Sequence, residues 1–262
     1  MDGFADGNDA LPRTSWEQRN YRLDRMDMRA LGRAYLTYPG VWAYAVLLLV
    51  LVAATALAPV TAWRAGLSAA AVVFLYPVFW YGLHRFVLHG TWLWRHQATA
   101  ALWKRIHYDH HREPNDLSVL FGSVGHTVPT VLILCGPVGW LIGGPDQALG
   151  GALVAVATGI AMTLLYEYVH CIQHLGTIPD SAWLRRIKRL HLLHHYHNET
   201  GNYGIVSEWP DRLLGSAYGE DRPLRPRSAT VRNLGYDEVA ARAHPHVAVL
   251  TARAPLGEDA PA

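Results

Sequence analysis

The chain has 262 residues, of which 51% are hydrophobic and only 17% are charged. Ordinary soluble domains carry about 25% charged residues, so this composition argues against a disordered chain and against an ordinary soluble enzyme. The formal net charge of +2 does not indicate a strongly basic nucleic-acid-binding protein, and no nucleic-acid partner is expected. The 15 histidines are the unusual feature of the composition.

Residues 1–40 are expected to form a cytoplasmic tail followed by a helix at a membrane surface. The first residues are acidic and polar, and they lack the basic and apolar regions of a cleavable signal peptide. Between residues 21 and 38, arginines alternate with Leu, Met and Tyr, which is typical of an interfacial helix and also of a soluble amphipathic helix. We therefore expect the first apolar segment to direct the chain to the membrane.

Four long segments without Asp, Glu, Lys or Arg follow. Each is close to the roughly 20 residues that a helix needs to cross the hydrocarbon core of a bilayer. The expected spans lie at 41–60, 67–83, 120–142 and 148–166. Because the connections at 61–66 and 143–147 are short, the four spans predict two helical hairpins. The predicted fold is an all-α integral membrane protein.

The remaining segments are polar. Residues 84–116 contain Trp92, Trp94 and Trp103, and tryptophans are typical of a membrane interface. This segment and the one after the fourth span predict a helical cap over the membrane helices. We expect residues 41–218 to form the four-span domain with its cap, and residues 219–262 to form a loosely packed C-terminal tail.

The basic residues predict the orientation. Residues 1–40 carry six Lys and Arg, 84–117 carry five and 171–262 carry eleven, so 22 of the 23 lie on one side of the predicted spans. The positive-inside rule assigns that side, with both termini and the cap, to the cytoplasm. With 2 lysines against 21 arginines, and with abundant Ala and Gly, the composition suggests a high-GC bacterium. The expected location is therefore a bacterial inner membrane.

Ten histidines form four clusters at the cytoplasmic ends of the predicted spans. Their spacings are HX4H, HX2HH, HX3H and HX2HH in chain order. The members are His84 and His89; His107, His110 and His111; His170 and His174; and His191, His194 and His195.

The spacing predicts a metal centre. Positions i, i+3 and i+4 share a helix face, so each HX2HH presents three imidazoles and HX3H presents two. In HX4H, five residues of α-helix end about 140° apart, so His84 and His89 either straddle a helix end or serve different metals. Ten imidazoles exceed the three or four ligands of one zinc site and would supply two metals with four or five ligands each. Imidazole suits Zn, Fe, Cu and Ni.

The four motifs, their order and the four spans resemble the fatty acid hydroxylase (sterol desaturase-like) superfamily of membrane-bound non-haem di-iron oxygenases. The spacings are most similar to those of the fatty acid 2-hydroxylases. The segment NYGIVSEWPDRLLG at 202–215 is similar to the segment after that family's last histidine box. The resemblance covers roughly residues 75–220, and it implies that the ten histidines named above are the metal ligands.

The resemblance implies two iron ions that use O2 as co-substrate to hydroxylate a lipid acyl chain taken from the bilayer, most closely 2-hydroxylation. Histidine spacing alone also admits zinc. Many eukaryotic 2-hydroxylases begin with a cytochrome b5 domain, whereas this chain has about 40 residues, without histidine, before the first predicted span. The expected electron donor is therefore a separate protein of the ferredoxin or cytochrome b5 type with its reductase.

Three carboxylates are candidates for orienting the ligand imidazoles through hydrogen bonds. Glu167 precedes His170 by three residues, Asp109 lies inside the second box, and Asp211 follows the fourth. No catalytic side chain beyond the metal centre is expected. Each carboxylate has an alternative interpretation as a solvated or helix-capping group.

Four other functions remain open. A carotenoid hydroxylase shares the spans and similar boxes, although its third box usually has a spacing other than HX3H. A sterol or isoprenoid oxidase would be expected to have a shorter first box. A desaturating or hydrocarbon-forming relative uses the same type of iron centre. A metal transporter, the alternative from another functional class, needs polar ligands near the membrane midplane, whereas these clusters lie at the ends of the spans.

Overall fold

The computed structural model describes residues 21–251, and within them it is helical, with one isolated β-bridge and no strand. Two π-helices interrupt the α-helical pattern at Leu83–Leu88 and Lys104–Tyr108, and two short 3-10 helices lie at Leu23–Arg25 and Leu117–Val119. The α-helices are α1 Met28–Thr37, α2 Pro39–Thr55, α3 Ala62–Gly82, α4 Trp92–Arg95, α5 Gln97–Trp103, α6 Asp109–Arg112, α7 Val124–His174, α8 Ala182–Tyr196, α9 Trp209–Leu213, α10 Glu238–Ala243 and α11 Pro245–Thr251.

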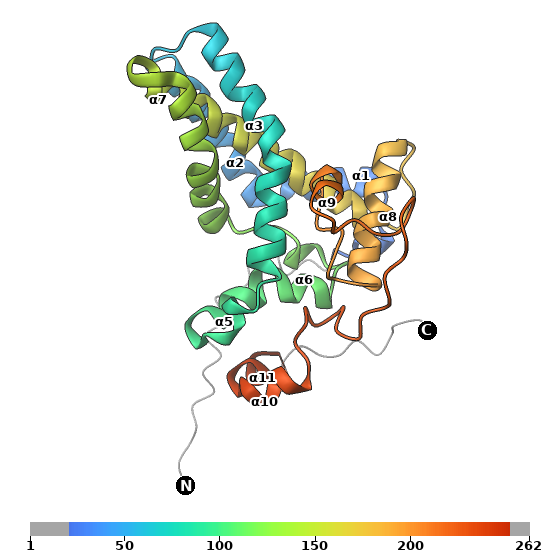
Figure 1. Cartoon of the computed structure of the whole chain (residues 1–262). Coiled ribbons are helices and arrows are strands. Elements are labelled where there is room, and N and C mark those ends of the chain that lie inside the picture. Colours follow the sequence, from blue (N-terminus) through green and yellow to red (C-terminus); the bar gives the residue numbers. More distant parts are fainter. Residues whose placement is uncertain (1–20, 252–262) are drawn as a thin grey trace.

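The apolar half of the molecule is formed by α2, α3 and α7, which lie side by side (Figure 1). Helix α7 is broken, because Gly144 has φ 64° and Gln147 also leaves the helical region. Its two arms then run back against each other so closely that a Cβ on Gly139 would lie 2.1 Å from the carbonyl oxygen of Gly151. Only glycine allows two backbones to approach in this way. The predicted second hairpin is therefore present as a helical hairpin within α7.

By length and composition, two helices are able to cross a membrane, namely Ala62–Arg95 and Val124–His174. The number rises to three if α1 and α2, which meet at 67°, form one span. Apolar helices suited to a membrane are thus confirmed, while four separate crossings stay a prediction.

Helix α1 is amphipathic. The Asp27 side chain caps its first turn by accepting a hydrogen bond from the Ala30 N–H at 2.7 Å. Leu31, Ala34 and Tyr35 are buried against the end of α7, where the Tyr35 hydroxyl donates to the Leu164 carbonyl at 2.7 Å. The predicted amphipathic helix is confirmed over residues 28–37 instead of 21–38. Its position at a membrane surface stays a prediction.

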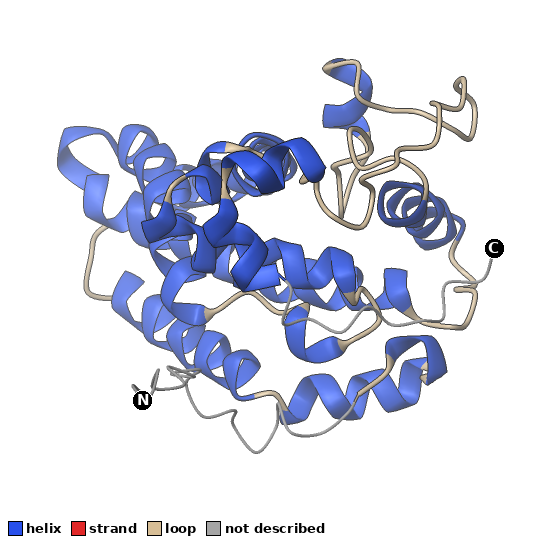
Figure 2. Cartoon of the chain, turned by 90° about the horizontal axis from the view of Figure 1, so that it is seen from below, coloured by secondary structure: helices blue, strands red, loops and turns tan. Residues whose placement is uncertain are grey.

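The polar half carries α4–α6, α8 and α9 around the ends of α3 and α7, and α10 and α11 lie below α5 in Figure 1. Figure 2, seen from below and coloured by secondary structure, shows helices joined by loops and no strand among the described residues.

The expectation of a loose tail after residue 219 is wrong for the described part of that segment. Leu234, Tyr236 and Val247 are buried in a core cluster with Trp94 and Trp103. The same cluster corrects the reading of these two tryptophans as interface residues, because they are 3% and 0% exposed. The segment after residue 219 is mostly polar, and its few apolar residues are too widely spaced to predict a core. In the structure these residues pack against α4 and α5.

Candidate metal centre

The ten box histidines form two groups of five. Within each group, one possible ligand atom from every residue lies within 4.8 Å of the others. All of them are buried except His89, which is partly exposed. The first group is His84, His89, His107, His111 and His194. The second group is His110, His170, His174, His191 and His195.

A π-helix joins the two histidines of the HX4H box. The His89 N–H donates to the His84 carbonyl at 3.0 Å, which is the i to i+5 bond of a π-turn. A wider turn returns residue i+5 to the face of residue i, so the two Nε2 atoms lie 3.2 Å apart. His84 and His89 therefore belong to one group, at the end of the helix. The alternative prediction, that they bind two different metals, is wrong.

Each HX2HH box is divided between the groups. His107 and His111 enter the first group, while His110, between them, enters the second. In α8, His191 and His195 enter the second group, and His194 enters the first. The i, i+4 pair thus shares one group, and the remaining histidine points to the other. Because of this division, the two groups are adjacent, with the rings of His111 and His195 4.2 Å apart.

The HX3H box lies in the last turn of α7 and contributes both residues to the second group. The Nε2 atoms of His170 and His174 lie 3.1 Å and 2.9 Å from the Nε2 atom of His191 on α8. The end of α7 is therefore joined to α8 at this group.

Backbone carbonyls orient three imidazoles of the first group. The Nδ1–H of His84 donates to Tyr203 O at 2.6 Å, that of His194 to Gly201 O at 2.7 Å, and that of His111 to Val231 O at 3.2 Å. A donated Nδ1 proton leaves the Nε2 atom with a lone pair for a metal.

The nitrogen positions fit bound metal ions. The Nε2 atoms of His111 and His194 lie 3.2 Å apart, although both rings already donate through Nδ1, so two lone pairs face each other. A cation between them removes this repulsion. Two nitrogens that are each about 2.1 Å from one ion are separated by about this distance. Buried neutral imidazoles without thiolate or carboxylate partners suit iron as well as zinc.

Burial keeps the cap histidines neutral. It lowers the pKa of His194 to about 4, and neighbouring imidazoles act in the same direction on the other histidines of the two HX2HH boxes. Burial also lowers the pKa of each of these well below the usual value, namely His107, His110, His111, His191 and His195. A metal ion requires the neutral imidazole, so the ligands are available at pH 7 without losing protons.

Asp211 fixes the loop that supplies the carbonyl for His84. Its buried carboxylate accepts hydrogen bonds from Tyr203 N at 2.9 Å, Gly204 N at 2.7 Å and Ser216 Oγ at 2.7 Å. The carboxylate approaches so closely that a Cβ on Gly204 would lie 2.9 Å from Oδ2. Burial raises the pKa of Asp211, while these three bonds oppose that rise by favouring the ionised form.

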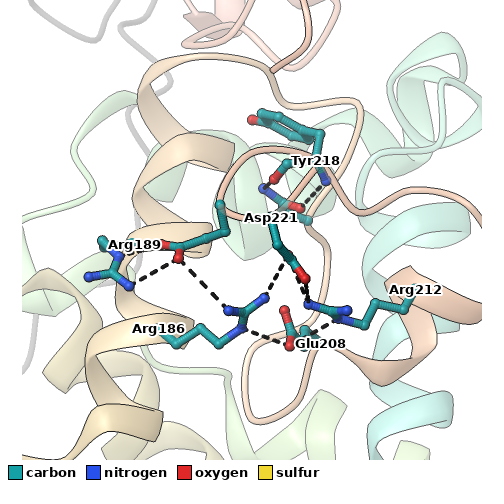
Figure 3. Close-up of polar contacts among 8 residues, drawn as sticks. Arg186, Arg189, Glu208, Arg212, Tyr218 and Asp221 are labelled. Carbon is teal, nitrogen blue, oxygen red and sulfur yellow. Dashed lines mark hydrogen bonds and ion pairs between the residues drawn. The ribbon is translucent and has the colours of Figure 1, made fainter. Parts of the chain in front are cut away.

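The ion pairs drawn in Figure 3 join α8 and α9 to the segments before and after α9. Arg186 on α8 contacts Glu208 at 2.8 Å and Asp221 at 2.9 Å, and Arg212 on α9 contacts Asp221 at 2.8 Å. Arg189 pairs with Glu220. Exposed ion pairs each contribute little to stability, but a network joins three segments at several points.

The three candidate carboxylates lie in different places. Glu167 is buried and accepts from the Gly122 N–H at 3.1 Å, so it holds the segment that enters α7. Asp109 forms an ion pair with Lys104 at 2.6 Å. Asp211 contacts the loop rather than a ring, and acts on His84 through Tyr203. The groups that orient the rings of His84, His111 and His194 are backbone carbonyls instead.

Sequence reasoning did not identify Gly201, Tyr203 and Val231 as imidazole partners. Their carbonyls carry no side-chain signal, and Val231 lies 120 residues from His111 in the chain. The NYG run that begins at Asn202 is a partial signal, since Asn202 has φ 53° and its side chain binds the Tyr218 backbone at 2.9 and 3.1 Å. Asn tolerates this left-handed conformation.

Comparison with known proteins gives one family. A model of the fatty acid hydroxylase family matches residues 69–216, more than half of the chain. The ceramide very long chain fatty acid hydroxylase of Saccharomyces cerevisiae is 32% identical over 154 residues, which are 58% of this chain and 38% of that protein. A dihydroceramide fatty acyl 2-hydroxylase of Arabidopsis thaliana is 28% identical over 160 residues, 59% of this chain and 62% of that protein.

A solved structure of full-length Scs7p, in which only the hydroxylase domain is visible, is also similar. It has a TM-score of 0.57 and 26% identity, and the match covers 71% of this chain and 68% of that one. A beta-carotene hydroxylase of a Paracoccus species is 28% identical over 120 residues, 44% of this chain and 64% of that protein. The match thus spans between 38% and 64% of the length of these curated relatives.

Proposed function

The chain belongs to the fatty acid hydroxylase family, and from this premise we propose that it is a membrane-bound non-haem di-iron monooxygenase that hydroxylates a lipid acyl chain at carbon 2. The observation that carries the proposal is the pair of adjacent five-histidine groups, which are composed of nitrogen donors only and in which nine of the ten histidines are buried. Two iron ions, when bound, would supply O2 activation and attack on an unactivated C–H bond.

The first group would hold one ion and the second group the other. The protein's own residues would fix the ring orientations, keep the imidazoles neutral and exclude water. His89 is the least buried of the ten, so the first group is the one that a substrate would approach. Zinc would fit the same nitrogens, and metal analysis distinguishes the two.

The substrate would enter from the bilayer. We infer four membrane crossings, by α2, α3 and the two arms of α7, with both termini and the histidine groups on the cytoplasmic side of a bacterial inner membrane. We also infer the domain limits of 1–40, 41–218 and 219–262, with the described part of the last segment packed on α4 and α5.

Electrons would come from a separate ferredoxin or cytochrome b5 with its reductase. Relatives named for ceramide and fatty acyl hydroxylation support an acyl substrate.

The test is mass spectrometry of hydrolysed total lipid from cells that express the wild type or His194→Ala, each with an electron donor supplied. We expect new 2-hydroxy fatty acids with the wild type and none with His194→Ala, because one first-group ligand is lost. His126→Ala, at an exposed histidine of α7, serves as the matched control and is expected to keep the product. Normal turnover by His194→Ala would contradict the di-metal mechanism.

A carotenoid hydroxylase is the second candidate, since two beta-carotene hydroxylases of Paracoccus species match at 28% and 27% identity. Oxygenated isoprenoids with unchanged acyl chains, in the same lipid extracts, would select this function. The metal centre would then stand, and only the substrate would change.

A further inference from the structure

Arg85 lies next to the first histidine group, and Asp211 is a carboxylate whose charge acts on it from beyond ion-pair distance. Arg85 follows His84 in the π-helix, it is partly buried, and among residues 21–251 no Asp or Glu oxygen forms an ion pair with it. The one hydrogen bond of its guanidinium runs from Nη1 to the Tyr81 hydroxyl. Four of its five N–H groups therefore have no hydrogen-bond acceptor within the described part of the chain.

The guanidinium is held in place by a chain of hydrogen bonds. The Tyr81 hydroxyl, which accepts from Arg85, bonds to Ser216 Oγ at 2.8 Å, and Ser216 donates to Asp211 at 2.7 Å. Tyr81 and Ser216 are both buried, with exposed fractions of 2%. The network that orients His84 through Tyr203 therefore also fixes Arg85.

Arg85 and His89, the histidine that is partly exposed, both contact the ring of Tyr203. The Cζ atom of Arg85 lies 5.8 Å from the centre of the Tyr203 ring, and the His89 ring lies 5.1 Å from the same centre. Arg85 also lies over the rings of Tyr81 and Phe86, at 5.9 and 5.1 Å. Aromatic rings hold a guanidinium by its face and leave its N–H edge available for a planar anion.

Apolar side chains are exposed on the elements around this position. Phe86 is 60% exposed, and Leu213 and Leu214 at the end of α9 are 73% and 50% exposed. Helix α9 is joined to α3 by the stacked rings of Phe74 and Trp209, 5.4 Å apart. A cation beside a metal-binding group, with exposed hydrocarbon on neighbouring elements, matches a ligand with an anionic head and an apolar chain.

We propose that Arg85 binds the carboxylate of a free fatty acid and thereby sets which carbon faces the first histidine group. Arginine matches a carboxylate with two parallel N–H···O bonds of about 2.8 Å, which keep the carbon next to the carboxylate within about 6 Å of Cζ. That carbon is position 2. This inference rests on the proposed function and deepens it by naming the head group and its anchor.

Equilibrium binding tests the anchor without any turnover. The probes are a fluorescent free fatty acid and its methyl ester, titrated into the purified protein in detergent. We expect the wild type to bind the acid about ten- to a hundred-fold more tightly than the ester, because a charged hydrogen-bonded pair is lost with the ester. Arg85→Gln should bind both probes with the affinity of the wild type for the ester.

Arg95→Gln is the matched control, since Arg95 also lies over a ring, that of Trp94 at 5.6 Å, but on α4. This variant should keep the preference for the acid. Equal affinity of the wild type for acid and ester, or a preference that survives in Arg85→Gln, would overturn the proposal. A loss of ester binding in Arg85→Gln would mean a structural role and would overturn it as well.

Product position gives a second readout. In the lipid assay above, Arg85→Gln is expected to spread hydroxylation over several carbons, so that the share of 2-hydroxy acid falls. If no variant and no wild type forms a hydroxylated lipid while the acid preference depends on Arg85, the proposed function fails and the anchor stands. If 2-hydroxy acid forms but its share is unchanged in Arg85→Gln, the anchor fails and the function stands.

Discussion

At the scale of single residues, three imidazoles of the first group are oriented by backbone carbonyls. His84, His111 and His194 each donate to a carbonyl of a loop, and the loop around Tyr203 is itself held by Asp211. A hydrogen bond to Nδ1 fixes both the tautomer and the direction of the ring. Residues that never contact a metal therefore decide how well one is held.

Asp211→Asn is expected to weaken metal retention about ten- to a hundred-fold, the range found for groups that orient ligands. The amide keeps one acceptor oxygen, whereas the carboxylate accepts from three donors. The measurement is metal per protein after dialysis against increasing chelator. Asp109→Asn, which removes an ion pair with Lys104, should retain metal like the wild type. Equal losses in both variants would favour the expectation that Asp109 orients a ligand.

At the scale of elements, two departures from regular α-helix shape the site. The π-turn at Leu83–Leu88 aligns His84 with His89, and the break in α7 turns one long apolar helix into a hairpin. Tight backbone contact between the arms needs small residues, since a Cβ on Gly139 would also lie 2.5 Å from the Ala155 Cβ. The end of α7 carries His170 and His174, so the hairpin positions part of the second group.

Gly139→Ala is expected to lower the stability of the protein by about 1–3 kcal/mol, because overpacking forces the arms apart. Gly136→Ala is the matched control in the same arm, where the nearest atom to an added Cβ is 3.8 Å away. Thermal unfolding in detergent measures the difference. If Gly139→Ala and Gly136→Ala unfold at the same temperature, the arms of α7 can move apart without a loss of stability, and this prediction is wrong.

The sequence predicted the four histidine clusters, the amphipathic first helix and the apolar segments, because spacing and charge are local properties. It left the HX4H box undecided, since nothing in LHRFVL indicates a π-turn. It also gave no sign that His110 and His111 enter different groups, which depends on how α6 and α8 face each other. The packing of Tyr236 and Val247 on Trp103 is a contact between distant segments, and such contacts leave no periodic pattern.

At the scale of the whole molecule, α2, α3 and α7 extend to one side, and α5, α6, α8 and α9 lie toward the other (Figure 1). The far ends of the hairpins are tied together, because Arg64 donates to Gly143 O at 2.6 Å and Thr61 N donates to Gln147 Oε1 at 2.7 Å. With 22 of the 23 basic residues in the sequence segments on the other side of the predicted spans, the charge distribution predicts one orientation in a membrane.

Single cysteines test that orientation. Leu57→Cys and Asp146→Cys, at exposed positions near the tied ends, should react with a membrane-impermeant maleimide in intact cells. Glu238→Cys on α10 should react only after the membrane is opened. Native Cys135 and Cys171 are buried and should contribute little background. Labelling of Glu238→Cys in intact cells would place the histidine groups outside and contradict the proposed orientation.

The division of each HX2HH box has an evolutionary consequence. Neighbouring residues, His110 with His111 and His194 with His195, enter different groups. Inserting or deleting one residue between the first histidine of a box and this pair would move one member of the pair into the helical position of the other and turn its neighbour away from both groups, so that a donor is lost. Length changes in these two segments should therefore be purged in any lineage that keeps the activity. The loops between the boxes, which no such shared register constrains, are free to vary in length.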